Sequence, residues 1–115
     1  MLGLTFPAKI TKVLDGDTVK IEIPAFVASV RLLDCWAAET RTTDQAEKQE
    51  GMVAKSHLQQ LLPEGQDVEV HVPIDFDGRF GGSLTFGRLL ARLKLDGQDV
   101  SEMMVASGHA TKERS

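Results

Sequence analysis

The stretch KITKVLDGDTVKIEI, residues 9–23, decides the fold of this chain. In its second half, Val19, Ile21 and Ile23 alternate with polar residues, which is the period of a half-buried strand. An Asp-Gly pair between two strand-like segments is a strong signal for a tight hairpin turn. We therefore expect two antiparallel strands here, joined by a turn at residues 15 and 16.

The next elements along the chain are a strand and a long helix. The segment FVASVRLL, residues 26–33, predicts a third strand, and Pro24 weakens strand pairing just before it. The polar residues that follow lead into a helix from Asp44 to Leu62, where apolar side chains recur at helical spacing. Asp44 can cap this helix, and Glu47 lies three residues later, as in a capping box.

Two more strands and a second helix complete the pattern. The segment QDVEVHV, residues 66–72, alternates valines with polar residues, and residues 84–95 predict a fifth strand. A short amphipathic helix follows over residues 99–108. Five short strands around one core suggest a small barrel, and the helices packed on it make the class α+β. We predict a single domain over residues 1–115, a five-stranded OB-type β-barrel with two packed α-helices.

Composition excludes several classes of protein. A hydrophobic content of 42% and a charged content of 26% are typical of a globular domain, and no segment is apolar enough to span a membrane or act as a signal peptide. The single cysteine, Cys35, excludes an intrachain disulfide and is expected to be buried. A cytoplasmic location and a monomer are the default expectations. With 13 basic against 17 acidic residues, a sequence-independent coat on duplex DNA is not expected.

Asp15 and Asp17 flank Gly16 in the predicted turn and allow two interpretations. Asp and Gly favour turns for purely local reasons. Alternatively, the two carboxylates could face one hard cation, because Ca²⁺ and Mg²⁺ prefer carboxylate oxygens.

The segment VRLLDCWAAET, residues 30–40, places Arg31 eight residues before Glu39. Eight residues of extended strand span about 27 Å at ~3.3 Å per residue, so the two side chains share a site only if the chain bends after Leu33. An arginine in so apolar a segment is not expected to stay unpaired.

Arg88 begins the fifth predicted strand and, like Arg31, is either a solvated strand residue or a phosphate ligand. A guanidinium binds two phosphate oxygens at once, whereas Arg92 is interpreted as a solvated strand arginine. Hydrolysis of a phosphodiester needs an activated water, neutralisation of charge on the phosphate oxygens and correct positioning. These arginines, together with Glu39 and Asp17, have the chemistry for those tasks.

The motifs VLDGDTVKI, VRLL with the later ET, FGRLLARLKLDG and DVSEMMVASGHA, taken in this order, resemble the staphylococcal nuclease (thermonuclease-like) family. The resemblance runs from about Thr11 to Ala110. It implies an OB barrel with packed helices and Ca²⁺-dependent cleavage of DNA and RNA phosphodiesters. We expect the partner of this chain to be nucleic acid, preferably single-stranded. It also implies that Arg31, Glu39 and Arg88 come together, with the arginines on the phosphate and the glutamate on the water.

On the metal side, the resemblance assigns Asp17 as a direct Ca²⁺ ligand, Asp15 as a supporting carboxylate and the backbone carbonyl of Ala37 as a further oxygen. The chain departs from the family at Trp36, where a second metal aspartate is typical, and at Ala38, where a proline is typical. Loss of one carboxylate predicts roughly tenfold to several hundredfold weaker metal binding.

Other departures concern the substrate groove. Thr85 stands where a lysine is typical, and the chain has no tyrosine. Trp36 either fills the space of the missing aspartate or stacks on a base of single-stranded nucleic acid. Asp34 either compensates as a metal ligand or serves a local backbone role.

Two further sets of residues are not predicted to bind a metal. Asp75 and Asp77 lie in a glycine-rich loop without the remaining ligands of an EF-hand. His57 and His71 have no partner at a zinc-ligand spacing.

Two functions follow from these observations. The first is a metal-dependent nuclease, favoured because a binding module has no need of an acid such as Glu39 beside the phosphate. The alternative is a catalytically weakened OB-fold module that binds nucleic acid or a protein partner, favoured by the departures at Trp36 and Ala38.

Overall fold

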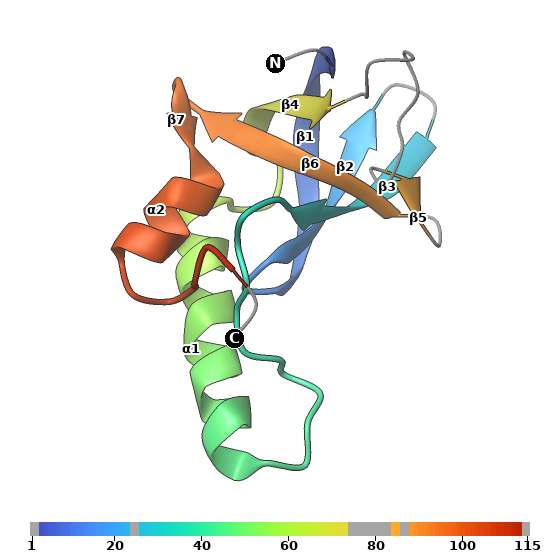
Figure 1. The fold of residues 1–115 in the computed structure, drawn as a ribbon. Coiled ribbons are helices and arrows are strands. Elements are labelled where there is room, and N and C mark those ends of the chain that lie inside the picture. Colours follow the sequence, from blue (N-terminus) through green and yellow to red (C-terminus); the bar gives the residue numbers. More distant parts are fainter. Residues whose placement is uncertain (1–2, 24–25, 74–83, 86–87, 114–115) are drawn as a thin grey trace.

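The computed structural model describes residues 3–23, 26–73, 84–85 and 88–113 (Figure 1). The elements in chain order are β1 (Gly3–Asp15), β2 (Thr18–Ile23), β3 (Phe26–Leu32), α1 (Gln45–Leu61), β4 (Asp67–Pro73), β5 (Leu84–Thr85), β6 (Arg88–Leu95), β7 (Gln98–Asp99) and α2 (Val100–Ala106).

Five strands form a closed barrel of mixed strand direction, which confirms the predicted α+β class and OB-type architecture. The strands β3, β2, β1, β4 and β6 pair antiparallel in that order. Parallel pairing of β3 with β6, with Ser29 opposite Arg88 and Arg31 opposite Leu90, then closes the barrel. Closure brings residues from the two parts of the chain that carry the predicted arginines onto neighbouring strands.

Strand β1 is longer than predicted and pairs with two neighbouring strands. Its first half, from Gly3 to Lys9, pairs with β4, and its second half pairs with β2. Register shifts between Ile10 and Lys12, and again before Asp15, interrupt the second ladder. Such bulges bend a strand and increase its twist, which lets one strand turn the corner of a small barrel.

Both helices begin at an aspartate. The Asp44 carboxylate accepts the backbone N–H groups of Ala46 and Glu47, which confirms it as the N-cap of α1. The predicted capping box is only half formed, because Glu47 accepts the hydroxyl of Thr42 and not the Asp44 N–H. Asp99 caps α2 in the same way as Asp44 caps α1.

The core lies inside the barrel and extends beneath the two helices (Figure 1). Helix α1 packs against β1, and α2 packs against β6 and β7. The largest fully buried side chains are Ile10, Ile21, Leu32, Leu58, Leu62, Leu93 and Met104, together with five valines at positions 19, 30, 70, 72 and 100. The alternating valines and isoleucines of the predicted strands therefore do point inward.

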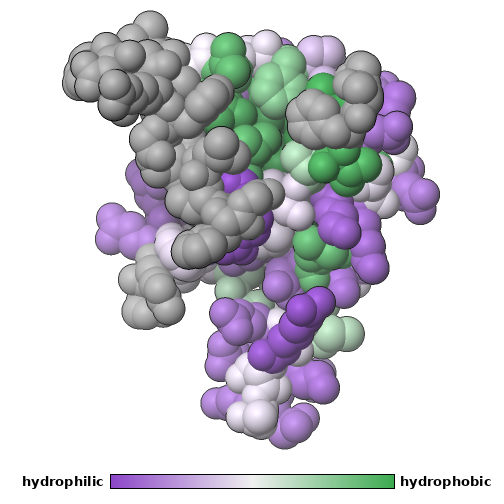
Figure 2. Space-filling view, turned by 90° about the vertical axis from the view of Figure 1, so that its right-hand side faces the viewer, coloured by the Kyte–Doolittle hydropathy of each residue, from purple (hydrophilic) through white to green (hydrophobic). Residues whose placement is uncertain are grey.

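The predicted strand over residues 84–95 is seen as β5 and β6, with residues 86–87 outside the described part. The loop with Asp75 and Asp77 also lies outside the described residues. No helix in the described part of the chain is long and apolar enough to cross a membrane. The lower projection of the molecule, made by the first turns of α1 and the loop before it, is mostly hydrophilic (Figure 2).

Candidate functional site

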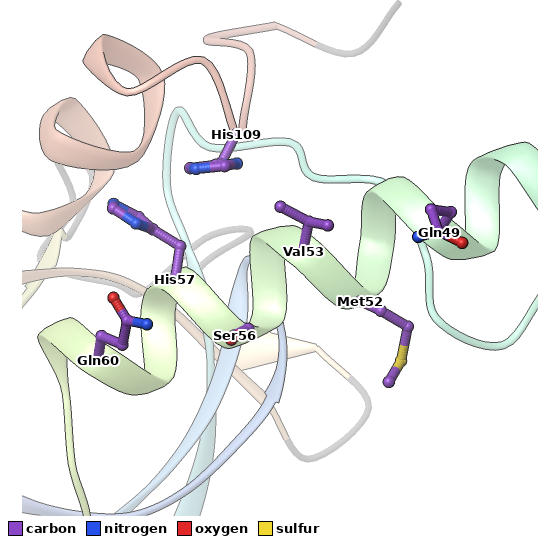
Figure 3. A pocket seen from close by; sticks show the side chains of 7 residues that line it. All are labelled: Gln49, Met52, Val53, Ser56, His57, Gln60 and His109. Carbon is purple, nitrogen blue, oxygen red and sulfur yellow. The ribbon is translucent and has the colours of Figure 1, made fainter.

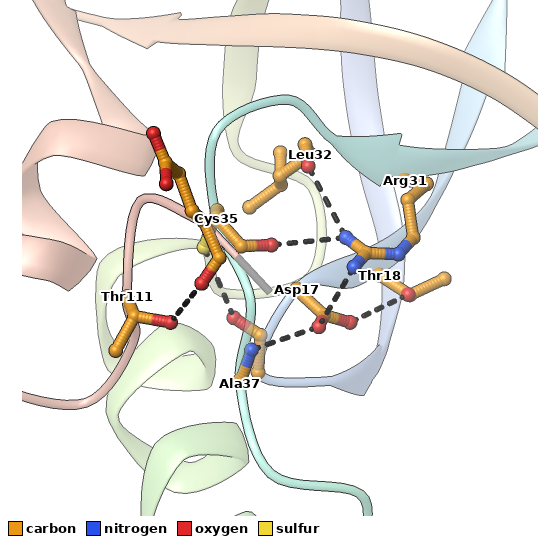
Figure 4. A network of polar contacts seen from close by, with 9 residues as sticks. Asp17, Thr18, Arg31, Leu32, Cys35, Ala37 and Thr111 are labelled. Carbon is orange, nitrogen blue, oxygen red and sulfur yellow. Dashed lines mark hydrogen bonds and ion pairs between the residues drawn. The ribbon is translucent and has the colours of Figure 1, made fainter. Parts of the chain in front are cut away.

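Arg31 is held at the end of β3 by backbone carbonyls and one carboxylate (Figure 4). Its Nη1 donates to the carbonyl oxygens of Leu32 at 3.2 Å and Cys35 at 2.9 Å. Its Nη2 lies 3.5 Å from Oδ2 of Asp17, and the two side chains are only 12% and 11% exposed. Arg31 is therefore paired, as its apolar surroundings predicted.

The bond from Arg31 to the Cys35 carbonyl shows how the chain bends after β3. Residues 33 and 34 form a turn, and Asp34 adopts φ 53°, a left-handed conformation that Asp tolerates better than most residues. The chain then passes back around the guanidinium of Arg31. The bend that Arg31 and Glu39 need in order to share a site is present.

Asp17 has both carboxylate oxygens engaged by the protein. Oδ1 accepts the Thr18 hydroxyl at 2.9 Å, while Oδ2 accepts the backbone N–H of Ala37 at 2.9 Å and faces Arg31. The predicted contribution of Ala37 was its carbonyl oxygen. In this structure the residue meets Asp17 through its N–H.

The segment 36–40 packs closely against Gly16 in the β1–β2 turn and against Gly51 in α1. A Cβ on Gly16 would lie 2.7 Å from the Cβ of Ala54 and 2.8 Å from that of Ala37. A Cβ on Gly51 would lie 2.5 Å from the carbonyl oxygen of Glu39. Only glycine fits at these two places, so they fix the path of the backbone that carries Glu39.

Glu39 lies between two anchors and is itself exposed. On one side Ala37 bonds to Asp17, and on the other the Thr40 hydroxyl donates to Asp15 at 2.5 Å. Within the described residues, no hydrogen bond or ion pair engages the Glu39 carboxylate. Asp15 thus positions the loop, and the neighbouring carboxylate of Glu39 is left open to solvent.

Arg88 lies at the start of β6 on the strand next to Arg31. Ser29 is opposite Arg88 and Arg31 is opposite Leu90, so the two arginines are on one face of the parallel pair, two residues apart in register. A strand spacing of ~4.8 Å and a rise of ~3.3 Å per residue place their Cα atoms about 8 Å apart. Arg88 is exposed.

Trp36 covers the buried arginine. The guanidinium carbon of Arg31 lies 4.1 Å from the centre of the Trp36 ring, within the range of a cation–π contact. The backbones of Trp36 and Thr111 exchange two hydrogen bonds. The Trp36 N–H donates to the Thr111 carbonyl at 2.8 Å, and the Thr111 N–H donates to the Trp36 carbonyl at 2.9 Å. Trp36 as a whole residue is still 38% exposed, so it is a partly covered rim residue and not part of the core.

The donor set does not fit a dedicated calcium site. Ca²⁺ takes six to eight oxygen ligands, whereas the oxygens of Asp17 are used by protein donors and by the cation of Arg31. In the described part of the chain, no group of three or more His, Cys, Asp or Glu residues is arranged around a common metal position. Asp34 does not supply the missing ligand, because its carboxylate pairs with Arg92.

The Arg92 cluster was missed by the sequence interpretation, which took this residue for a solvated strand arginine. Arg92 pairs with Asp34 and, at 2.7 Å, with Asp99, the residue that caps α2. Although burial acts against the charged form, the hydrogen bond and charge of Asp99, reinforced by Asp34, raise the pKa of Arg92. This cluster links the turn after β3 to β6 and α2, a contact between distant segments that spacing along the chain does not reveal.

Cys35 is fully buried beside the Arg31–Asp17 pair, as predicted. Burial, with a further contribution from the negative charge of Asp17, raises the pKa of its thiol to about 12. A thiol that is neutral at physiological pH is a poor nucleophile, so Cys35 is a packing residue.

The structure thus joins Arg31 directly to Asp17 and Trp36. Asp15 binds the loop that carries the exposed Glu39, and Arg88 starts the strand next to that of Arg31. A comparison with models of known protein families finds none that matches the chain.

Proposed function

We propose that this barrel is a nuclease that binds a phosphodiester of DNA or RNA at Arg31 and Arg88 and hydrolyses it with the help of Glu39. The observation that carries the proposal is the tie between the loop that bears the exposed Glu39 and the Arg31–Asp17 pair, made by the hydrogen bond from the Ala37 N–H to Asp17. The pairing of β3 with β6, with Ser29 opposite Arg88, supports a role for Arg88 at the same site.

Each residue has a defined task in the proposed reaction. Arg31 and Arg88 donate N–H groups to the non-bridging oxygens and stabilise the negative charge that grows as water attacks phosphorus. Glu39 accepts the proton of that water, whose oxygen forms the new P–O bond while the P–O bond to one sugar oxygen breaks. The leaving sugar oxygen takes a proton from solvent and becomes a hydroxyl. Arg31 can act here because its ion pair with Asp17 is long, at 3.5 Å, and leaves N–H donors for a ligand.

The binding of single strands is expected from the same surface. The exposed part of the Trp36 ring offers a stacking face for a base, and base–aromatic stacking contributes about 1–3 kcal/mol per base. The net charge of −4 keeps non-specific attraction to long duplexes low, so recognition is confined to this small site.

The test is cleavage of a fluorescent single-stranded DNA oligonucleotide with calcium varied from zero to tens of millimolar. Glu39→Gln is the key variant, and Glu64→Gln, an exposed carboxylate just beyond α1, is the matched control. We expect Glu39→Gln to abolish cleavage and Glu64→Gln to leave it unchanged, with both proteins folded by circular dichroism. Equal activity of Glu39→Gln and the unmodified protein would overturn the proposed mechanism.

A second candidate function is binding of nucleic acid without hydrolysis. It is favoured by one specific observation, the use of both Asp17 oxygens by protein donors where a divalent cation would need them. In that case the oligonucleotide stays intact at every calcium or manganese concentration but still quenches Trp36, the only tryptophan in the chain. Quenching that is lost in Arg31→Lys would assign binding to this site.

A further inference from the structure

A second cluster of potential ligands, made of residues that the Arg31 site does not use, lies between α1 and the segment after α2. His57 on α1 and His109 have ring centres 4.5 Å apart with an angle of 37° between the ring planes. The two rings lie close together and both line an open hollow of about 410 Å³ (Figure 3). The pair is made by the fold, because 52 positions separate the two histidines in the sequence.

The spacing of the rings fits two imidazoles on one metal ion. With a metal–nitrogen distance of about 2.0–2.1 Å and ~1.1 Å more to the ring centre, two ligands at 90–110° place their ring centres roughly 4.5–5.2 Å apart. The observed separation lies at the lower end of this range. The tilt of 37° is neither the parallel offset stack nor the edge-to-face contact that aromatic pairs prefer.

Both histidines are held by rigid backbone. His57 is in the interior of α1, next to the fully buried Leu58. His109 follows Gly108, which has φ 83°, and its N–H donates to the carbonyl of Met104, so the end of α2 fixes its position. Little rearrangement is needed to bring the two rings to one ion, and ligands that are already in place bind more tightly.

The side chains that line the hollow indicate which class of metal ion it would bind. None of its seven lining residues is an acid or a lysine or arginine, so neither a carboxylate for Ca²⁺ or Mg²⁺ nor a repelling cation is present there. Imidazole nitrogen favours late first-row metals, with Cu²⁺ bound most tightly and Ni²⁺ and Zn²⁺ following. The amide of Gln60, one turn along α1 from His57, lies on the same side and can supply a weak third ligand (Figure 3).

We propose that His57 and His109 form a binding site for a divalent late transition metal, with the remaining coordination positions filled by water. This site is separate from the proposed nuclease site and does not depend on it. A metal there ties α1 to the segment after α2, because its two protein ligands come from those two elements.

The first experiment is calorimetric titration of the untagged, full-length protein with Ni²⁺ alone. The variants are His57→Gln and His109→Gln, and His71→Gln is the matched control, since His71 is the only other histidine. We expect one Ni²⁺ per chain and roughly a tenfold or greater loss of Ni²⁺ affinity in either ligand variant. Removal of a residue that only supports a metal ligand already costs about 10- to 100-fold in affinity, so removal of a ligand itself should cost at least tenfold. His71→Gln is expected to bind as the unmodified protein does.

The second experiment places the metal and guards against variants that fail to fold. Substoichiometric Cu²⁺, which is paramagnetic, is expected to broaden the amide signals around His57 and His109 and to spare those around His71. Gln60→His adds a third imidazole one turn from His57 and is expected to raise Ni²⁺ affinity roughly tenfold or more. Unchanged affinity in both ligand variants, or broadening centred on His71, would overturn the proposal and leave the ring pair as a packing contact.

Discussion

Arg31 and Arg92 lie on the same outward face of the β3–β6 pair, yet their surroundings differ. Arg92 is bound by two carboxylates, those of Asp34 and Asp99. Arg31 has one carboxylate at 3.5 Å, two backbone carbonyls and the face of Trp36. A phosphate that approached Arg92 would meet two negative charges, whereas at Arg31 it would also meet the exposed Arg88. The comparison shows that Arg92 links parts of the fold, and it supports the proposal that Arg31, rather than Arg92, binds the phosphate.

The largest expected effect distinguishes the two arginines by activity. Arg31→Lys removes the planar guanidinium, which binds two backbone carbonyls and, in the proposed mechanism, a phosphate. We therefore expect the rate of oligonucleotide cleavage to fall about 100-fold or more. Arg92→Lys is expected to change cleavage less than about threefold, since no proposed phosphate contact involves it. Steady-state kinetics on both variants measures the difference, and equal losses would mean that the comparison is wrong.

The next effect concerns the buried ion pair. Asp17→Ala leaves the Arg31 charge without its carboxylate and the hydroxyl of Thr18 and the N–H of Ala37 without an acceptor. We expect a loss of about 3 kcal/mol in the free energy of unfolding. Asp17→Asn, which keeps an acceptor oxygen, is expected to lose clearly less. Urea denaturation provides the values, and identical losses in the two variants would show that the hydrogen bonds contribute little.

Cys35 makes the free energy of unfolding depend on pH near the Arg31 site, because its thiol is buried beside Arg31 and Asp17. Its pKa is raised from 9.0 to about 12, so from about pH 9 upward the unfolded chain releases a proton that the folded chain keeps. The contribution of the thiol is complete below about pH 9 and declines above it by up to about 1.4 kcal/mol per pH unit. Urea unfolding at pH 8 and pH 10 should show a steeper decline for the unmodified protein than for Cys35→Ala. Parallel declines would contradict the shift.

The smallest expected effect is at the Arg92 cluster. Asp34→Asn removes one charge but keeps a residue that tolerates the left-handed conformation, and the Asp34 side chain is 46% exposed. We expect a loss of less than about 1 kcal/mol by urea denaturation and unchanged cleavage. Asp34→Ala should lose more, because alanine is strained at φ 53°. A loss of cleavage in Asp34→Asn would connect the two arginine clusters in function.

Local patterns predicted most of the fold. The alternation in residues 9–23 and 66–72 gave the strands and their inward faces, and the aspartates at positions 44 and 99 mark the starts of both helices. The extension of β1 to Gly3 and the division into β5 and β6 were not predicted, because they depend on pairing with strands far away in the sequence. The role of Arg92 was missed for the same reason.

Short-range patterns show which groups the chain has available. They include an apolar alternation that must be buried, the capping aspartate Asp44, a turn between two carboxylates, and arginines and a glutamate with the chemistry to act on a phosphate. These properties depend on residues that are near one another in the chain, so short-range geometry is enough to recognise them.

Which of these groups meet depends on how the strands and helices pack in three dimensions. Barrel closure brought Arg88 to the strand beside Arg31, the turn at Asp34 folded the chain back over the guanidinium, and α1 met the segment after α2 at His57 and His109. These contacts join residues far apart in the chain. They form because the buried faces of the strands and helices can be covered in one arrangement, and this arrangement, not the spacing along the chain, sets the distances between charges and ligands.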